Sequence, residues 1–102
     1  MMFGSKIKQL REELQLPQRV VASALELDTP MYSRIELGRR TAKRAQIPVI
    51  ANVLKTSENE LAALWLADKI IAAIGDEKEA ADDALKVVQQ KITESGTRTK
   101  TR

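Results

Sequence analysis

The stretch PQRVVASALELDTPMYSRIELG, residues 17–38, predicts two short helices joined by a tight connection. The first helix is expected over residues 18–25, directly after a proline, which is favoured at the start of a helix. Asp28 is a strong N-cap for a second helix over residues 29–37, because its side chain can accept a backbone N–H of the first turn. Gly38 suits the position just beyond that helix, where the backbone often turns left-handed. Two short helices connected in this way predict a helix-turn-helix.

Apolar residues at helical spacing continue on both sides of this stretch. Upstream, Ser5 can cap a helix that ends at Leu16, because the residue before a proline avoids the helical region. Downstream, a fourth helix follows the basic residues 39–44, and Pro48 is expected to kink it or to force a later start. The positions predicted to face the core recur at spacings of three and four residues: Ile7, Leu10, Leu14, Val21, Ala22, Leu25, Tyr32, Ile35, Ile47, Ile50, Ala51 and Leu54.

Residues 57–92 add two longer helices. A Ser-x-x-Glu capping box opens the first of them, and Gly75 stops it. The second begins at Asp76 and carries apolar residues as far as position 92. Residues 93–102 lack apolar side chains and predict a disordered basic tail. No segment shows the alternation of a strand, so the expected fold class is all-α.

Charge is divided unevenly along the chain. Residues 1–56 carry ten Lys/Arg and five Asp/Glu, which gives +5, whereas residues 57–92 carry four and eight, which gives −4. Residues 93–102 carry three bases and one acid, so the net charge is +3. A basic front half favours a polyanionic partner such as nucleic acid, although asymmetries of this size also arise by chance.

The composition excludes several classes of function. The chain has no cysteine and no histidine, which excludes disulfides, thiol chemistry, Cys/His metal sites and histidine acid–base catalysis. The longest apolar stretch, residues 61–75, contains Asp68 and Lys69 and is too short to span a membrane. Residues 1–4 do not begin a secretory signal, so we expect a cytoplasmic protein. We also expect neither a cofactor nor a metal.

Several residue identities are similar to the phage-repressor-like (Cro/C1, or XRE) helix-turn-helix family of transcriptional regulators, in its small controller or repressor form. The similarity covers about residues 5–61. It is carried by Leu10-Arg11-Glu12, Gln18, Val21-Ala22, Tyr32-Ser33-Arg34-Ile35-Glu36-x-Gly38, Ile50-Ala51-x-x-Leu54 and Leu61. The resemblance implies a five-helix, lambda-repressor-like DNA-binding domain over residues 1–61, to which this chain adds a C-terminal helix.

In this family the third helix enters the major groove of DNA, where its outward residues meet base edges. With Tyr32 and Ile35 buried, the residues expected to read bases are Thr29, Pro30, Met31, Ser33 and Arg34. Arg34 is the strongest candidate, because a guanidinium can bond guanine O6 and N7 together. A phosphate contact or a solvated side chain is the alternative for Arg34.

Phosphate contacts are expected around the recognition helix. The residues assigned to them are Gln18, Arg19, Arg39, Arg40, Lys43 and Arg44, each with solvent exposure as the alternative. The resemblance also implies a structural ion pair between Arg11 and Glu36, which would fix the angle of the recognition helix. Pro17 stands where the family has a capping Ser or Thr, so that cap is expected to be lost.

The helices over residues 57–92 hold more apolar surface than a minimal domain needs. We assign it to an isologous dimer interface, with completion of the monomer core as the alternative. The interface residues would be Leu64, Trp65, Ile71, Ile74, Leu85, Val88 and Ile92.

The expected function is that of a sequence-specific transcriptional regulator that binds double-stranded DNA. It would bind a pseudo-palindromic operator as a homodimer. The alternative is an antitoxin-type interaction module whose back half binds a toxin and which regulates its own operon. An enzyme is not expected, because the dense carboxylates near residues 76–83 are typical of a solvated helix face.

Overall fold

The computed structural model describes residues 1–100, with side chains up to residue 95. The described chain contains no strand and is all-α, as predicted. Its helices are α1 (Met2–Glu13), α2 (Gln18–Ala24), α3 (Thr29–Glu36), α4 (Ile47–Leu54), α5 (Glu58–Ile74) and α6 (Lys78–Lys100), with a 3-10 turn η1 (Arg44–Gln46) before α4. Contacts divide the chain into two units, and the boundary between them in the sequence falls between Ile70 and Ile71.

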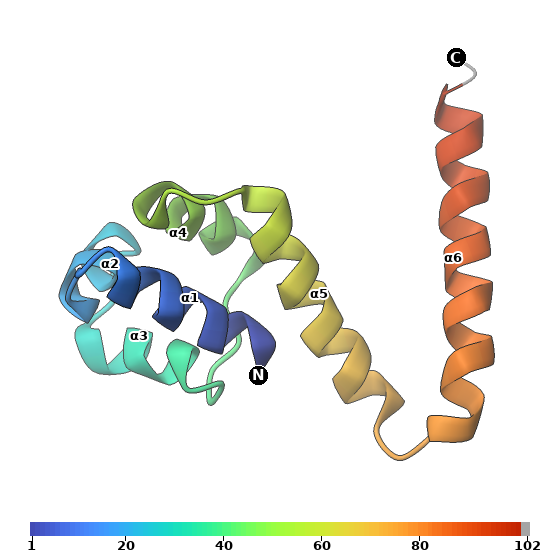
Figure 1. Ribbon diagram of the computed structural model, residues 1–102, viewed down its shortest axis with the longest axis horizontal. Helices are drawn as coiled ribbons and strands as arrows, with labels where there is room; N and C mark the ends of the chain where they lie inside the picture. Colours follow the sequence, from blue (N-terminus) through green and yellow to red (C-terminus); the bar gives the residue numbers. More distant parts are fainter. Residues whose placement is uncertain (101–102) are drawn as a thin grey trace. The chain divides into compact units, whose positions relative to one another are not determined.

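The first unit is built around α1, which lies between α3 and α4 (Figure 1). Helix α2 packs against both α3 and α4. The largest fully buried side chains are Ile7, Val21, Tyr32, Ile35, Ile47, Ile50 and Leu61. All but Leu61 were predicted from helical spacing, and Leu61 belongs to the family pattern quoted above. The first turns of α5 therefore complete the core of the first unit.

A glycine allows α1 to approach α3 closely. A Cβ atom built on Gly4 would lie 2.4 Å from the carbonyl oxygen of Glu36 and 2.7 Å from that of Ile35. Both atoms belong to backbone, which cannot rotate away as a side chain could. The absence of a side chain at Gly4 thus sets the distance between α1 and the end of α3.

Helix α5 holds the beginning of α1 through a buried carboxylate. The backbone N–H of Met2 donates to Asp68 Oδ1 at 3.0 Å, and that of Phe3 donates to Oδ2 at 2.9 Å. Asp68 therefore satisfies two of the N–H groups that a helix leaves unpaired at its start. On the same helix, the indole N–H of Trp65 donates to the carbonyl of Ala42 at 2.7 Å.

Three of the predicted helix boundaries need correction. Helix α1 begins at Met2, so Ser5 lies inside it and does not cap it. Pro48 does not kink α4, because it sits in the first turn, where its missing N–H is not needed. Helix α6 continues to Lys100, so residues 93–100 are helical and not disordered. Residues 101–102 of the predicted tail lie outside the described residues.

Candidate nucleic-acid interface

Helix α3 presents one face of mixed character to solvent and one apolar face to the core. Its N-cap is Asp28, whose Oδ1 accepts the backbone N–H of Met31 at 2.8 Å, as predicted. At its end Gly38 has a φ of +78°, the left-handed conformation that glycine adopts without strain. Tyr32 and Ile35 are fully buried. The expected base-reading residues lie on the other side: Thr29, Pro30 and Arg34 are exposed, and Met31 and Ser33 are half-buried.

An ion pair ties α3 to α1. Arg11 Nε lies 2.7 Å from Glu36 Oε2, and Arg11 Nη2 donates to Glu36 Oε1 at 3.1 Å. The third contact of the guanidinium runs from Nη1 to the carbonyl of Leu16 at 2.8 Å. The fork geometry fixes the orientation of both side chains. The pair that the family resemblance implied is therefore present.

Gln18 takes part in the same network. Its Nε2 donates to Glu36 Oε1 at 3.0 Å, so the amide joins the start of α2 to the end of α3. This contact was not expected, because we had assigned Gln18 to a DNA phosphate. Pro17, the N-cap of α2, makes no side-chain capping bond, as its chemistry requires.

The surroundings keep Glu36 ionised. Burial alone would raise the pKa of the Glu36 carboxyl, but hydrogen bonds from Arg11 and Gln18, with the charge of Arg11, outweigh burial and lower it. The hydrogen bond to Glu36 in turn raises the pKa of Arg11. Burial, followed by the nearby Glu36 carboxylate, raises the pKa of Tyr32 well above its usual range. The Tyr32 hydroxyl is buried and lacks a hydrogen-bond partner among the described residues.

Exposed basic side chains follow α3. Arg39, Arg40, Lys43 and Arg44 all reach solvent, as does Arg19 on α2. The backbone N–H groups of Arg39 and Arg40 both donate to the carbonyl of Arg34, at 2.8 and 3.2 Å, which turns the chain back around the end of α3. Among the basic residues predicted to bind phosphate, Arg44 forms an ion pair in the described part of the chain, since its Nη2 lies 3.2 Å from Glu58 Oε2. Both of these side chains are about half exposed, so the pair is weak and open to exchange.

A family model described as a helix-turn-helix domain matches residues 2–64. The chain belongs to this helix-turn-helix family. The match agrees with the resemblance to Cro/C1-like regulators and with a lambda-repressor-like all-α fold. The comparisons with curated proteins and with solved structures gave no match.

Within this helix-turn-helix domain, α2 and α3 are the paired helices of the motif, and the domain is of a DNA-binding type. Sequence reasoning missed one exposed residue of α3's outer face. Leu37, at the C-cap, is 58% exposed and lies three and four residues after Arg34 and Ser33. The spacing of three and four residues from Arg34 and Ser33 could have placed Leu37 on the same helix face as those two residues.

The predicted dimer residues divide into two groups. Leu64 and Trp65 pack against the core of their own unit, so for these two the structure favours the alternative, completion of the monomer. Ile74 is half-buried, while Ile71, Leu85, Val88 and Ile92 are exposed. Leu66, Ile70 and Val87 are also exposed and were not predicted. The helix-turn-helix match ends at residue 64, so most of this apolar surface lies beyond it.

The described helices carry neither membrane-spanning character nor a cluster of metal ligands. None of them combines the length and the apolar character that crossing a bilayer requires. Within the described residues, acidic side chains do not gather in groups of three that could hold a metal ion.

Proposed function

We propose that this chain is a sequence-specific transcriptional regulator, of repressor or controller type, that binds a pseudo-palindromic operator as a homodimer. The observation that carries the proposal is the exposed outer face of α3, which includes Arg34 and is held at a fixed angle by the Arg11–Glu36 pair. A recognition helix must present side chains to base edges without moving when it binds. Helix α3 meets both requirements.

Sequence reading is assigned to the outer face of α3. Arg34 bonds guanine O6 and N7, and Ser33 bonds a neighbouring base edge. Thr29, Pro30 and Met31 make apolar contact with thymine methyl groups in this proposal. Since Pro30 has neither a polar side chain nor a backbone N–H, Arg34 carries the largest share of the discrimination.

Affinity is assigned to phosphate contacts on both sides of α3. Arg39, Arg40, Lys43 and Arg44 contact one strand, and Arg44 exchanges Glu58 for a phosphate when DNA arrives. Arg19 and Gln18 contact phosphates on the other side of the groove. A primary amide has two N–H hydrogens, so Gln18 can bond a phosphate while it still donates to Glu36.

Two copies are needed because one recognition helix reads only a few base pairs. In a dimer of this class the two recognition helices reach half-sites about 34 Å apart, so the operator has two-fold symmetry. The exposed apolar residues Ile71, Leu85, Val88 and Ile92, with Ile74, supply the contact between copies in this proposal.

Selection of bound sites from a random duplex pool tests this function. The expected result is an enriched motif whose two halves are related by two-fold symmetry. Retention of DNA without any enriched motif would contradict sequence-specific regulation. Enrichment of a single unrepeated half-site would contradict binding as a symmetric dimer.

A further inference from the structure

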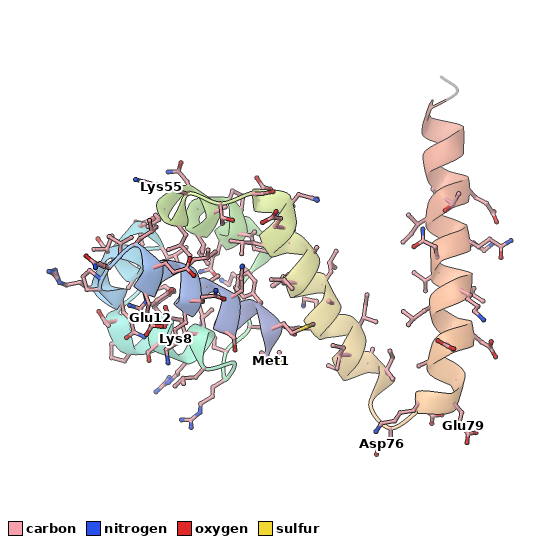
Figure 2. All side chains as sticks on the ribbon, viewed as in Figure 1. Met1, Lys8, Glu12, Lys55, Asp76 and Glu79 are labelled. Atoms are coloured by element: carbon pink, nitrogen blue, oxygen red, sulfur yellow. The ribbon has the colours of Figure 1, made fainter. Side chains whose placement is uncertain are left out.

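Helix α6 carries a narrow apolar stripe that the chain leaves in solvent. Leu85, Val88 and Ile92 are 43%, 48% and 60% exposed, and Ala81 continues the stripe one turn earlier. Among the described side chains of α6, Ala81 alone is half-buried and the others are exposed. In the view of Figure 2, side chains of α6 project to both sides of the helix.

The spacing of the stripe is that of a two-helix contact. Residues 81, 85, 88 and 92 are separated by four, three and four positions, the repeat that keeps a seam facing one partner helix. An isolated helix draws little stability from its backbone alone, and in proteins most helical stability comes from packing an apolar face. The stripe therefore marks the side of α6 on which a partner helix packs.

Charge along α6 sets the orientation of that partner. Residues 76–83, around the start of α6, carry five acids and one lysine, a net −4, whereas residues 90–97 carry one base and one acid, a net charge of zero. Two such helices in parallel would place acidic half against acidic half. Reversing one of them, with residue 81 opposite residue 92, places residues 76–83 beside residues 90–97 and so removes this like-charge repulsion.

Side-chain size in the stripe favours the same orientation. In an antiparallel pair centred between Leu85 and Val88, Ala81 faces Ile92 of the other helix and Leu85 faces Val88. Each layer then combines a larger with a smaller side chain, as close packing requires. A parallel pair would place Ala81 against Ala81 and leave that layer underfilled.

We propose that α6 pairs antiparallel with α6 of a second copy of this chain, through Ala81, Leu85, Val88 and Ile92. The inference rests on the proposed homodimer and specifies which helix forms it and in which direction. An antiparallel pair has a two-fold axis across its middle, which is the symmetry that a palindromic operator demands.

Two neighbouring valines allow a matched test of the contact. Val88 lies in the stripe, whereas Val87 lies outside it and is 56% exposed. Val88→Asp should raise the dimer dissociation constant at least about tenfold, because it would bury a carboxylate in the pair. Val87→Asp should leave it within about twofold, as a surface substitution. Sedimentation over a wide range of protein concentration measures both. Equal effects, or a wild-type chain that stays monomeric throughout, would overturn the proposal.

Cysteine pairs test the direction, and the chain contains no native cysteine to interfere. Ala81→Cys and Ile92→Cys are prepared as separate variants, oxidised alone and then as a mixture. The antiparallel pair predicts a disulfide-linked dimer from the mixture and little from either variant alone. Efficient self-linking of each variant would show a parallel pair, and absence of linking in all three samples would contradict any α6 pairing.

The same preparations separate this inference from the function it rests on. Cross-linking and sedimentation are carried out without DNA, while retention of the duplex pool is measured independently. A chain that selects a two-fold symmetric operator and dimerises equally well with Val88→Asp would overturn the α6 pair alone. A chain that dimerises through α6 but retains no DNA would overturn the proposed function alone.

Discussion

At the scale of single residues, Arg34 and Arg40 differ in what they are expected to contribute. Arg34 lies on the outer face of α3, whereas Arg40 lies in the loop that follows. Arg34→Ala should cost about 1–3 kcal/mol on the selected operator and little on random DNA, since it removes a base contact. Arg40→Ala should weaken both alike and reduce the salt slope by about one.

The measurement is binding to operator and random duplexes at several salt concentrations. Lys86→Ala supplies a control, because Lys86 is an exposed base on α6, outside the helix-turn-helix match. An unchanged ratio of specific to random binding in Arg34→Ala would show that another residue reads the sequence.

Glu36 makes stability depend on acid. Its pKa in the folded chain is lowered, so its contribution is present above the ordinary glutamate value of about 4.3 and is lost as pH falls through the folded pKa. Glu36→Gln should therefore lower the free energy of unfolding at neutral pH by about 3–5 kcal/mol, because it leaves Arg11 buried without its charge partner. It should also flatten the decline in stability below about pH 5.

Thermal melting between neutral pH and about pH 3 follows both effects. Glu79→Gln is the matched control, since Glu79 is an exposed glutamate on α6. If the two variants show the same melting temperatures at every pH, the ion pair does not hold the fold.

At the scale of elements, the contact of α1 with α3 depends on the missing side chain of Gly4. Gly4→Ala would push a methyl group into the carbonyls of Ile35 and Glu36, so it should destabilise the chain by about 1–3 kcal/mol despite the better helix propensity of alanine. Ser5→Ala, at the exposed neighbouring position, should leave stability the same or slightly higher.

Denaturant unfolding compares the two variants, and operator affinity reports whether α3 has shifted. A Gly4→Ala chain as stable as Ser5→Ala would mean that the two helices can separate without cost.

The features that the sequence predicted are the local ones. Asp28 and Gly38 act on the backbone within a few residues of themselves, so their residue types were sufficient to bound α3. Core positions followed from helical spacing for a similar reason. The Arg11–Glu36 pair spans 25 residues, and only the family resemblance pointed to it.

The features that were missed are the distant ones. Asp68 caps a helix 66 residues earlier in the chain. A single aspartate in an apolar helix does not indicate from the sequence which backbone groups it binds. By sequence alone Gly4 is only a residue of low helix propensity, and its role in the close approach to α3 is visible only in the structure. Trp65 could be a core or an interface residue by composition, and its bond to Ala42 places it in the monomer. The residues assigned to DNA remain predictions.

At the scale of the whole molecule, the DNA-binding unit extends further along the chain than its sequence motif does. Leu61 is buried in the core, Trp65 packs against it, and Asp68 caps α1. A fragment of residues 1–56 should therefore fail to show a cooperative thermal transition. A fragment of residues 1–75 should melt cooperatively, stay monomeric and bind the operator more weakly than the full chain.

Circular dichroism during heating and sedimentation measure these outcomes. A cooperative transition in the 1–56 fragment would show that α5 is not part of the folding unit. A dimeric 1–75 fragment would place the contact between copies on α5 and not on α6.

The capping of α1 by Asp68 also affects the order in which the chain folds during synthesis. A ribosome releases the chain from its first residue onward, at about 5–20 residues per second. The backbone N–H groups of Met2 and Phe3 therefore cannot bond to Asp68 until residue 68 has been released. Closing the chain between residues 2 and 68 is also slow compared with the formation of single helices. Since Arg11 joins α1 to α3, the nascent chain acquires a fully supported helix-turn-helix only after most of α5 has left the ribosome.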